Sequence, residues 1–226
     1  MSLIAVMAAF EEEARVGETV REVMPFVDRL VVVDDGSRDH TAERARALGA
    51  TVFRHAVNRG QGAALKTGTL AALDLGATII VHVDADGQHD PSAIPSLIAP
   101  IRSGMADVVF GSRLLDDAYT TIPPSRRVLL AGARSFNRFV LGIPRQITDP
   151  QCGFRAMTAE AVHHIPFTQD RYAHASEILR VVTRSSLRWQ EVPVRVRYST
   201  ETLAKGQHAL DALAIVWHLI LGAFQS

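Results

Sequence analysis

The sequence predicts an α/β protein built on a mostly parallel sheet that is flanked by helices. Short runs of apolar residues recur along the first half of the chain, and segments with helical periodicity separate them. These runs show no alternation of polar and apolar side chains, which is typical of strands buried on both faces in a helix-covered parallel sheet. The composition, 47% hydrophobic and 21% charged, is sufficient for a packed core.

The expected elements alternate in a regular order. Five strands are expected at residues 3–9, 29–35, 50–55, 77–84 and 106–113. Helices are expected between them at residues 11–24, 39–48, 60–75 and 91–103. Ligands of such sheets bind beyond the carboxyl ends of the strands. Acidic residues follow three of the expected strands, as Glu11–Glu13, Asp34–Asp35 and Asp84–Asp90.

The pattern is looser after residue 113. We expect a helix at 125–142, a loop at 149–157 that enters a short strand, a helix at 174–185, a strand pair or bent strand at 187–199, and an apolar C-terminal helix at 208–224. We interpret residues 1–226 as a single domain with two halves, 1–113 and 114–226.

The composition argues against several classes of protein. The 24 basic and 24 acidic residues balance, so no overall attraction to nucleic acid is expected. Cys152 is the single cysteine, which excludes an intramolecular disulfide and a cysteine zinc cluster and fits a cytoplasmic location. The N-terminus lacks the pattern of a signal peptide, and no apolar run is long enough to span a membrane.

The segment "DADGQHD" gives the sharpest chemical signal. Asp84 and Asp86 are two residues apart at a strand end, with the amide of Gln88 nearby. Such oxygen donors suit Mg²⁺ or Mn²⁺, which keeps some waters and takes ligands from a diphosphate. Asp90, which precedes Pro91, is better explained as a helix N-cap. Haloacid dehalogenase-like phosphatases also carry a DxDG sequence, but in those proteins it follows an early strand and continues differently. The phosphatase class is therefore disfavoured.

Two further segments follow strand ends. In "VVVDDGSRDHT", Asp35 could accept hydrogen bonds from a base or a ribose, whereas a turn and an N-cap account for Ser37 and Asp39. In "NRGQGAALKTG", glycines open a helix, where backbone N–H groups could approach an anion and Lys66 or Arg59 could add charge. A tight turn with close helix packing explains these glycines equally well.

Six segments, taken together and in this order, resemble inverting glycosyltransferases of family 2, which have the GT-A fold. The segments are "AAFEEE", "VVVDDGSRDHT", "NRGQGAALKTG", "VDADGQHDP", "FGSR" and "DPQCGFR". The resemblance is closest to the branch of dolichyl-phosphate mannose synthase and its bacterial polyprenyl-phosphate relatives, and it covers nearly the whole chain. The opening segment departs from the family pattern, because Phe10 replaces a tyrosine and the proline is missing. The resemblance implies a donor half, residues 1–113, and an acceptor half, residues 114–226.

The resemblance and the motifs together give a set of site residues. A nucleotide sugar, with UDP favoured over GDP, is expected to contact Ala9, Phe10, Glu12, Asp35, Lys66, Asp84 and Ala85. The metal is expected at Asp84, Asp86 and Gln88. Catalytic roles are expected for Asp86, Arg113, Asp149 and Glu177.

Arginine dominates the start of the acceptor half. Between residues 113 and 145 there are six arginines against Asp116 and Asp117. Two interpretations explain their helical stripe equally well. One is an ordinary amphipathic surface helix, and the other is a helix that lies at a membrane and binds lipid phosphate. Contacts with an acceptor phosphate are expected from Arg113, Arg126, Arg127 and Lys205.

The acceptor decides whether a base is needed. A lipid monophosphate is mostly a dianion at neutral pH, because its second pKa is about 6. A sugar hydroxyl would need a carboxylate base, for which Asp149 and Glu177 are the candidates. We therefore favour transfer to a polyprenyl or dolichyl phosphate by an enzyme at the inner face of the membrane, in contact with the membrane or a small membrane partner. The alternatives are a hydroxyl of a cell-surface glycan as acceptor, and a non-catalytic nucleotide-sugar-binding protein.

Overall fold

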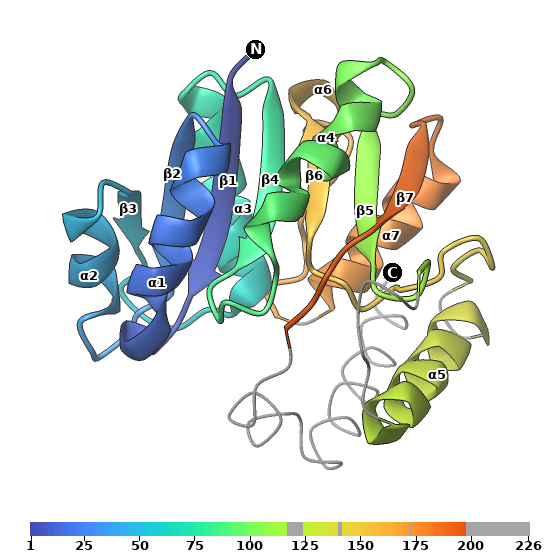
Figure 1. Cartoon of the computed structure of the whole chain (residues 1–226), viewed down its shortest axis with the longest axis horizontal. Helices are drawn as coiled ribbons and strands as arrows, with labels where there is room; N and C mark the ends of the chain where they lie inside the picture. The colour runs from blue at the N-terminus through green and yellow to red at the C-terminus, as the bar shows by residue number, and fades with distance from the viewer. Residues whose placement is uncertain (117–123, 140–141, 172, 198–226) are drawn as a thin grey trace.

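A single seven-stranded sheet organises the computed structural model, which describes residues 1–116, 124–139, 142–171 and 173–197 (Figure 1). The strand order is β3-β2-β1-β4-β6-β5-β7. The strands are β1 (Leu3–Ala9), β2 (Arg29–Asp34), β3 (Thr51–Arg54), β4 (Ile79–Asp84), β5 (Val108–Ser112), β6 (Arg155–Thr158) and β7 (Trp189–Pro193). Strand β6 is antiparallel to both its neighbours, and every other pairing is parallel. The predicted fold class, a mostly parallel α/β sheet, is confirmed.

Helices cover both faces of the sheet (Figure 1). They are α1 (Glu13–Val23), α2 (Thr41–Ala47), α3 (Gln61–Asp74), α4 (Ile94–Arg102), α5 (Pro124–Phe139), α6 (Ala159–Val162) and α7 (His174–Arg184), with 3₁₀ turns η1 (Met24–Phe26) and η2 (Pro91–Ala93). Val20 of α1 and Leu97 of α4 belong to one buried cluster, whereas Leu65 of α3 and Ile178 of α7 belong to the other. The strands therefore bury apolar side chains on both faces, as their sequences predict.

The expected elements of the first half agree with the observed ones to within two residues at most boundaries. In the second half, the helix expected at 125–142 appears as α5, and Gly142 beyond it has a positive φ of 67° that a helix does not contain. The bent strand expected at 187–199 appears as β7 followed by a single bridge between His89 and Val196. The helix expected at 208–224 lies outside the described residues. Among the described helices, none combines the length and the apolar character needed to cross a bilayer.

The sheet topology brings the polar segments together at one edge. In the parallel register, Ala9 of β1 lies beside Asp34 of β2, and Ala8 lies beside Asp84 of β4. The carboxyl ends of these three strands therefore meet where the chain order reverses, which is where open α/β sheets bind ligands. Because β6 runs antiparallel, its first residue, Arg155, pairs with His82 near the same edge. The loop that precedes β6 thus reaches the same place from the second half of the chain.

Candidate active site

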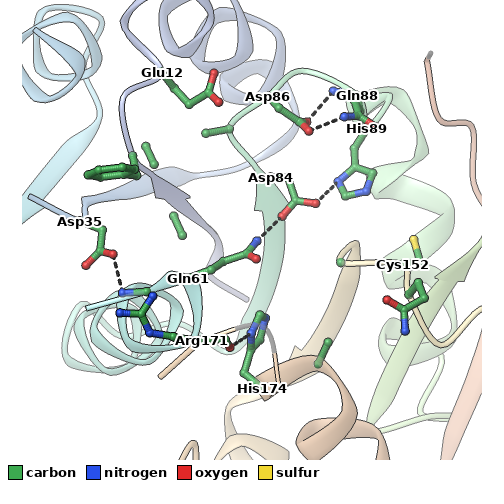
Figure 2. A pocket seen from close by; sticks show the side chains of 18 of the residues that line it. Glu12, Asp35, Gln61, Asp84, Asp86, Gln88, His89, Cys152, Arg171 and His174 are labelled. Carbon is green, nitrogen blue, oxygen red and sulfur yellow. Dashed lines mark hydrogen bonds and ion pairs between the residues drawn. The ribbon is translucent and has the colours of Figure 1, made fainter. Parts of the chain in front are cut away.

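An open cavity of about 490 Å³ lies at this edge, and both halves of the chain line it (Figure 2). We call its two sides the donor wall and the acceptor wall. The donor wall comprises Ala8, Ala9, Phe10, Glu12, Asp35, Asn58, Gly60, Gln61, Asp84, Ala85, Asp86, Gln88 and His89. The acceptor wall comprises Arg113, Gln151, Cys152, Gly153, Arg155, Arg171, His174, Ala175, Ser176 and Val196.

Most of the expected donor-site residues line this cavity. Lys66 is not among the lining residues, and its side chain is exposed on α3. The expectation that Lys66 contacts the nucleotide sugar stays a prediction. Arg126 and Arg127 belong to α5, but their side chains lie outside the described part of the structure, as does the whole of Lys205.

Asp84 stands at the centre of the cavity, between two neighbours that hold its carboxylate (Figure 2). The amide nitrogen of Gln61 donates to Oδ1 at 2.9 Å, and Nδ1 of His89 lies 3.7 Å from Oδ2. Gly153 closes the third side, because a Cβ at that position would come within 2.8 Å of Oδ2. The ring of His89 is itself stacked on Phe154, with centroids 4.9 Å apart. Gln61, His89 and the loop before β6 together therefore fix the position of Asp84.

Asp86 is held by the loop that follows β4. The backbone N–H of Gln88 donates to Oδ1 at 3.0 Å, and the amide nitrogen of Gln88 donates to Oδ2 at 2.6 Å. Burial and the nearby charge of Asp84 raise the pKa of Asp86. Two carboxylates that repel each other in a partly buried cavity are stabilised by a cation.

The Asp84–Asp86 pair fits a hard divalent cation. Its carboxylate oxygens, with the amide oxygen of Gln88, are the donor type that Mg²⁺ and Mn²⁺ prefer. Within the described residues, no cluster of three or more His, Cys, Asp or Glu side chains forms a complete protein cage for a metal. The remaining ligands would have to come from water and from a bound diphosphate, which is how Mg²⁺ is usually held.

Asp35 connects β2 to the start of α3. It is 2% exposed, and it accepts hydrogen bonds from the backbone N–H groups of Arg59 and Gly60, at 3.0 and 2.6 Å, and from Nδ1 of His55 at 2.6 Å. Asp35 therefore fixes the "NRGQG" turn at the cavity as well as lining it. Its neighbour Asp34 is fully buried and bonded to Ser37 and Arg54, so it has a structural role.

The glycines of "NRGQGAALKTG" serve close packing. A Cβ at Gly60 would lie 2.5 Å from the carbonyl oxygen of Asp170, and a Cβ at Gly62 would lie 2.0 Å from that of Gln169. Gly68 lets α3 approach Val6 of the sheet in the same way. Of the two interpretations that the sequence left open, close packing accounts for all three glycines. It also brings the loop before α7 to the cavity, with Arg171 and His174.

Arg113 and Asp149 form a buried bidentate ion pair. Nε and Nη2 of Arg113 donate to the two carboxylate oxygens at 2.6 and 2.7 Å, and the backbone N–H of Arg113 donates to Oδ2 at 3.0 Å. Arg113 lines the cavity, whereas Asp149 does not. Both oxygens of Asp149 are directed at Arg113, and the expectation that Asp149 removes a proton from an acceptor stays a prediction. Its geometry is that of a residue that positions Arg113.

Glu177 also lies away from the cavity lining. Its carboxylate accepts hydrogen bonds from the backbone N–H groups of Thr168 and Gln169, at 3.0 and 3.1 Å, and from the hydroxyl of Thr168. It therefore orders the loop before α7, and the catalytic role expected for Glu177 stays a prediction. Such a carboxylate, which lies near the start of a helix and accepts hydrogen bonds from the N–H groups before it, caps the helix. The sequence alone does not distinguish a capping carboxylate from an exposed base.

The sequence analysis missed several polar residues of the cavity lining, among them Gln61, His89, Arg155, Arg171 and His174. Arg155 offered a signal, because it is an arginine that directly precedes the apolar residues Ala156 and Met157. Burial lowers its pKa to about 10, and burial together with the charge of Arg155 lowers the pKa of His174 to about 4. Burial likewise raises the pKa of Cys152 to about 12, so this thiol is not a nucleophile at neutral pH.

The fold and the cavity define a class of protein: a GT-A glycosyltransferase, with its aspartate pair at the carboxyl end of β4. One solved structure that is similar to the chain is glucosyl-3-phosphoglycerate synthase from Mycobacterium tuberculosis in complex with UDP, with a TM-score of 0.72 and 25% identity. The match covers 99% of this chain and 79% of that one.

The chain belongs to glycosyl transferase family 2, whose model matches residues 4–165. It is 30% identical to the UDP-N-acetylglucosamine--dolichyl-phosphate N-acetylglucosaminyltransferase of Methanococcus voltae, over 96% of this chain and 94% of the relative. It is 32% identical to the dolichol-phosphate mannosyltransferase of Pyrococcus furiosus, over 84% of this chain and 54% of the relative. The predicted family and branch are confirmed, and the chain is a glycosyltransferase.

Proposed function

We propose that this glycosyltransferase transfers a hexose from a nucleotide sugar to a polyprenyl or dolichyl phosphate, with inversion and with Mg²⁺ or Mn²⁺ at the donor. One observation carries the choice of acceptor. The acceptor wall contains Arg113, Arg155 and Arg171, and no carboxylate occurs among its described residues. Such a wall attracts a phosphate and offers no carboxylate base to a hydroxyl acceptor.

The donor wall supports the other half of the proposal. Glu12, Asp35, Asp84 and Asp86 are its acidic residues, and Asp84 and Asp86 stand at the strand end where a diphosphate and its cation would lie. When bound, the cation neutralises negative charge that develops on the departing diphosphate. Gln61 and His89 hold Asp84 in place, and Gln88 holds Asp86. Phe10 and Asp35, which line the same cavity, would contact the nucleoside.

The acceptor wall would position the nucleophile. A lipid monophosphate needs little activation, because it is mostly a dianion above its second pKa of about 6. The task of the protein is then to hold the phosphate against the anomeric carbon on the face opposite the leaving group. Arg113 is suited to this task, because Asp149 fixes its guanidinium from behind. Arg126, Arg127 and Lys205 would add phosphate contacts from the acceptor half.

The relatives agree with this acceptor class. The relative from Methanococcus voltae is named for a dolichyl-phosphate acceptor and a UDP-sugar donor, and a relative from Haloferax volcanii, 30% identical over 86% of this chain, is named a dolichyl-phosphate hexose transferase. We accordingly favour a UDP-sugar over GDP-mannose. A lipid acceptor would bring the enzyme to the inner face of the membrane, where it would contact the membrane surface or a small membrane partner. Nucleic acid is not an expected partner, because the net charge is zero.

Radiolabelled sugar transfer tests the proposal. The protein is incubated with membranes or a polyprenyl phosphate, with UDP- or GDP-sugars, and with Mg²⁺ or Mn²⁺. We expect label in lipid that organic solvent extracts and that mild acid releases as the free sugar. Label only in a water-soluble glycan would contradict the lipid phosphate acceptor. Absence of both transfer and donor hydrolysis with every donor would instead indicate a non-catalytic binding protein.

A further inference from the structure

Arg155 places a positive charge in the interior of the protein, at the floor of the cavity. It opens β6 and is 1% exposed, yet it lines the acceptor wall. Its Nε donates to the carbonyl oxygen of Gly153 at 3.2 Å, and its Nη2 lies 3.4 Å from Nε2 of His174. Within the described structure, none of its hydrogen bonds goes to a carboxylate. A buried charge without a direct ion pair is costly, and it is retained where it serves a ligand or a nearby charge.

His174 holds this guanidinium as a neutral acceptor. Its Nδ1 lies 2.8 Å from the carbonyl oxygen of Arg171, and because a carbonyl only accepts, Nδ1 carries the ring proton. Nε2 is therefore an acceptor that faces Nη2 of Arg155. Burial, together with the charge of Arg155, lowers the pKa of His174 to about 4, so the ring stays neutral at neutral pH. His174 thus aims Arg155 without cancelling its charge.

The negative charge that acts on Arg155 belongs to Asp84. The charge of Asp84 opposes the effect of burial on the pKa of Arg155, which remains about 10. Gly153 joins the two groups, because its carbonyl oxygen accepts from Arg155 while its Cα side packs against the carboxylate of Asp84. Arg155 is therefore a fixed counter-charge behind the aspartate that faces the proposed donor site.

We propose that Arg155, aimed by His174, is a positioning residue that makes the donor site take a divalent cation and a nucleoside diphosphate together rather than the cation alone. A cation that arrives alone at Asp84 meets the repulsion of Arg155. The negative charge of a diphosphate that arrives with the cation offsets this repulsion. The inference rests on the proposed function, because it assumes that the cation and the diphosphate bind at the donor wall.

The test measures binding of Mn²⁺ without turnover. Free Mn²⁺ is quantified by electron paramagnetic resonance for the full chain and for Arg155→Met, each without and with saturating UDP. We expect Arg155→Met to bind Mn²⁺ alone about fivefold more tightly, because one repelling charge is removed. We expect the ratio of the Mn²⁺ dissociation constants without and with UDP to fall by a similar factor. Replacement of a buried charge by an apolar side chain of similar size is often tolerated.

The direction of the change distinguishes positioning from a merely structural role. If Arg155 only supported the fold, Arg155→Met would weaken binding of Mn²⁺ alone, and an unchanged or weaker affinity in a folded variant overturns the proposal. Arg155→Gln keeps a donor for Gly153 and loses the charge, and it replaces Arg155→Met if that variant does not fold. Arg102→Met, which removes one exposed charge at the end of α4, should leave Mn²⁺ binding within about twofold because solvent screens that charge.

Failure of the proposed function has a different signature. If the unmodified protein binds no Mn²⁺ with or without UDP, the proposed donor site is wrong, and this inference falls with it. If the unmodified protein binds Mn²⁺ more tightly with UDP and Arg155→Met keeps the same ratio of dissociation constants, the donor site stands and only the role of Arg155 is overturned. His174→Leu, which removes the acceptor of Nη2, should reduce that ratio less than Arg155→Met, because the charge stays.

Discussion

The donor wall and the acceptor wall differ in charge and in construction. The donor wall carries four acidic residues and no lysine or arginine, and it is built from three adjacent strand ends and the segments that follow them. The acceptor wall carries three arginines and no acidic residue among its described members, and it is built from loops around β5, β6 and α7. An acidic wall that can hold a cation thus faces a cationic wall that can hold a phosphate. This asymmetry fits the proposed transfer between two phosphorylated compounds.

The largest expected effect comes from removing the cation site of the donor wall. Asp86→Asn keeps the size of the side chain and removes its charge, so we expect sugar transfer to fall by about a thousandfold or more. The melting temperature should change by no more than a few degrees, because Asp86 is bonded only within its own loop. Asp74→Asn, an exposed change at the end of α3, is the matched control and should keep full activity. Retained transfer in Asp86→Asn would mean that the cation site is elsewhere.

A change in the acceptor wall should affect stability and activity together. Asp149→Asn leaves the buried guanidinium of Arg113 without its carboxylate, so we expect the free energy of unfolding to fall by about 3–5 kcal/mol. The double variant Arg113→Met/Asp149→Leu should recover much of this stability, because apolar side chains replace both members of the buried pair, but it should not recover transfer. Denaturant titration and a transfer assay measure the two effects. Full activity in the double variant would remove Arg113 from the proposed phosphate site.

The packing between the two walls gives the next effect. Gly62→Ala would place a Cβ 2.0 Å from the carbonyl oxygen of Gln169, so the loop that carries Arg171 must move. We expect a loss of about 1–3 kcal/mol in the free energy of unfolding and weaker donor binding. Gly132→Ala in α5 is the matched control, because a Cβ there meets nothing within 4 Å, and it should be neutral or slightly stabilising. Equal melting temperatures for the two variants would contradict the close-packing role.

The smallest effect is expected at Glu177. Glu177→Gln keeps one acceptor oxygen for the N–H groups of Thr168 and Gln169, so the free energy of unfolding should fall by about 1 kcal/mol and transfer should stay within a few fold. Thermal unfolding and initial rates test both statements. A folded Glu177→Gln variant that has lost nearly all transfer would support Glu177 as the catalytic base and favour a hydroxyl acceptor.

The donor wall was largely predictable from the sequence, and the acceptor wall was not. Asp35, Asp84 and Asp86 each follow an apolar strand, so the rule that ligands bind at the carboxyl ends of strands suffices to bring them together. Arg155 and His174 reach the same cavity because β6 runs antiparallel and because the loop before α7 packs against the start of α3. No local pattern encodes that strand direction.

The surroundings of two acidic residues show a physical limit of the sequence. Asp149 and Glu177 are acidic residues in the acceptor half, and a sequence shows their charge but not where it is directed. The structure directs Asp149 at Arg113 and Glu177 at the loop before its own helix. The glycines around Gln61 show the same limit of the sequence. A tight turn and a phosphate loop have the same composition, and only the structure shows that these glycines make room for the loop at residues 169–171.

The central claim, that the acceptor is a phosphate and needs no carboxylate base, is tested most directly by a comparison of two acceptors. A short-chain polyprenyl phosphate and the corresponding alcohol are supplied with the same labelled nucleotide sugar, and rates are measured between pH 5 and 8. We predict transfer to the phosphate alone, with a rate that rises as the phosphate loses its second proton near pH 6 and is level above pH 7. Transfer to the alcohol at a comparable rate would contradict the account.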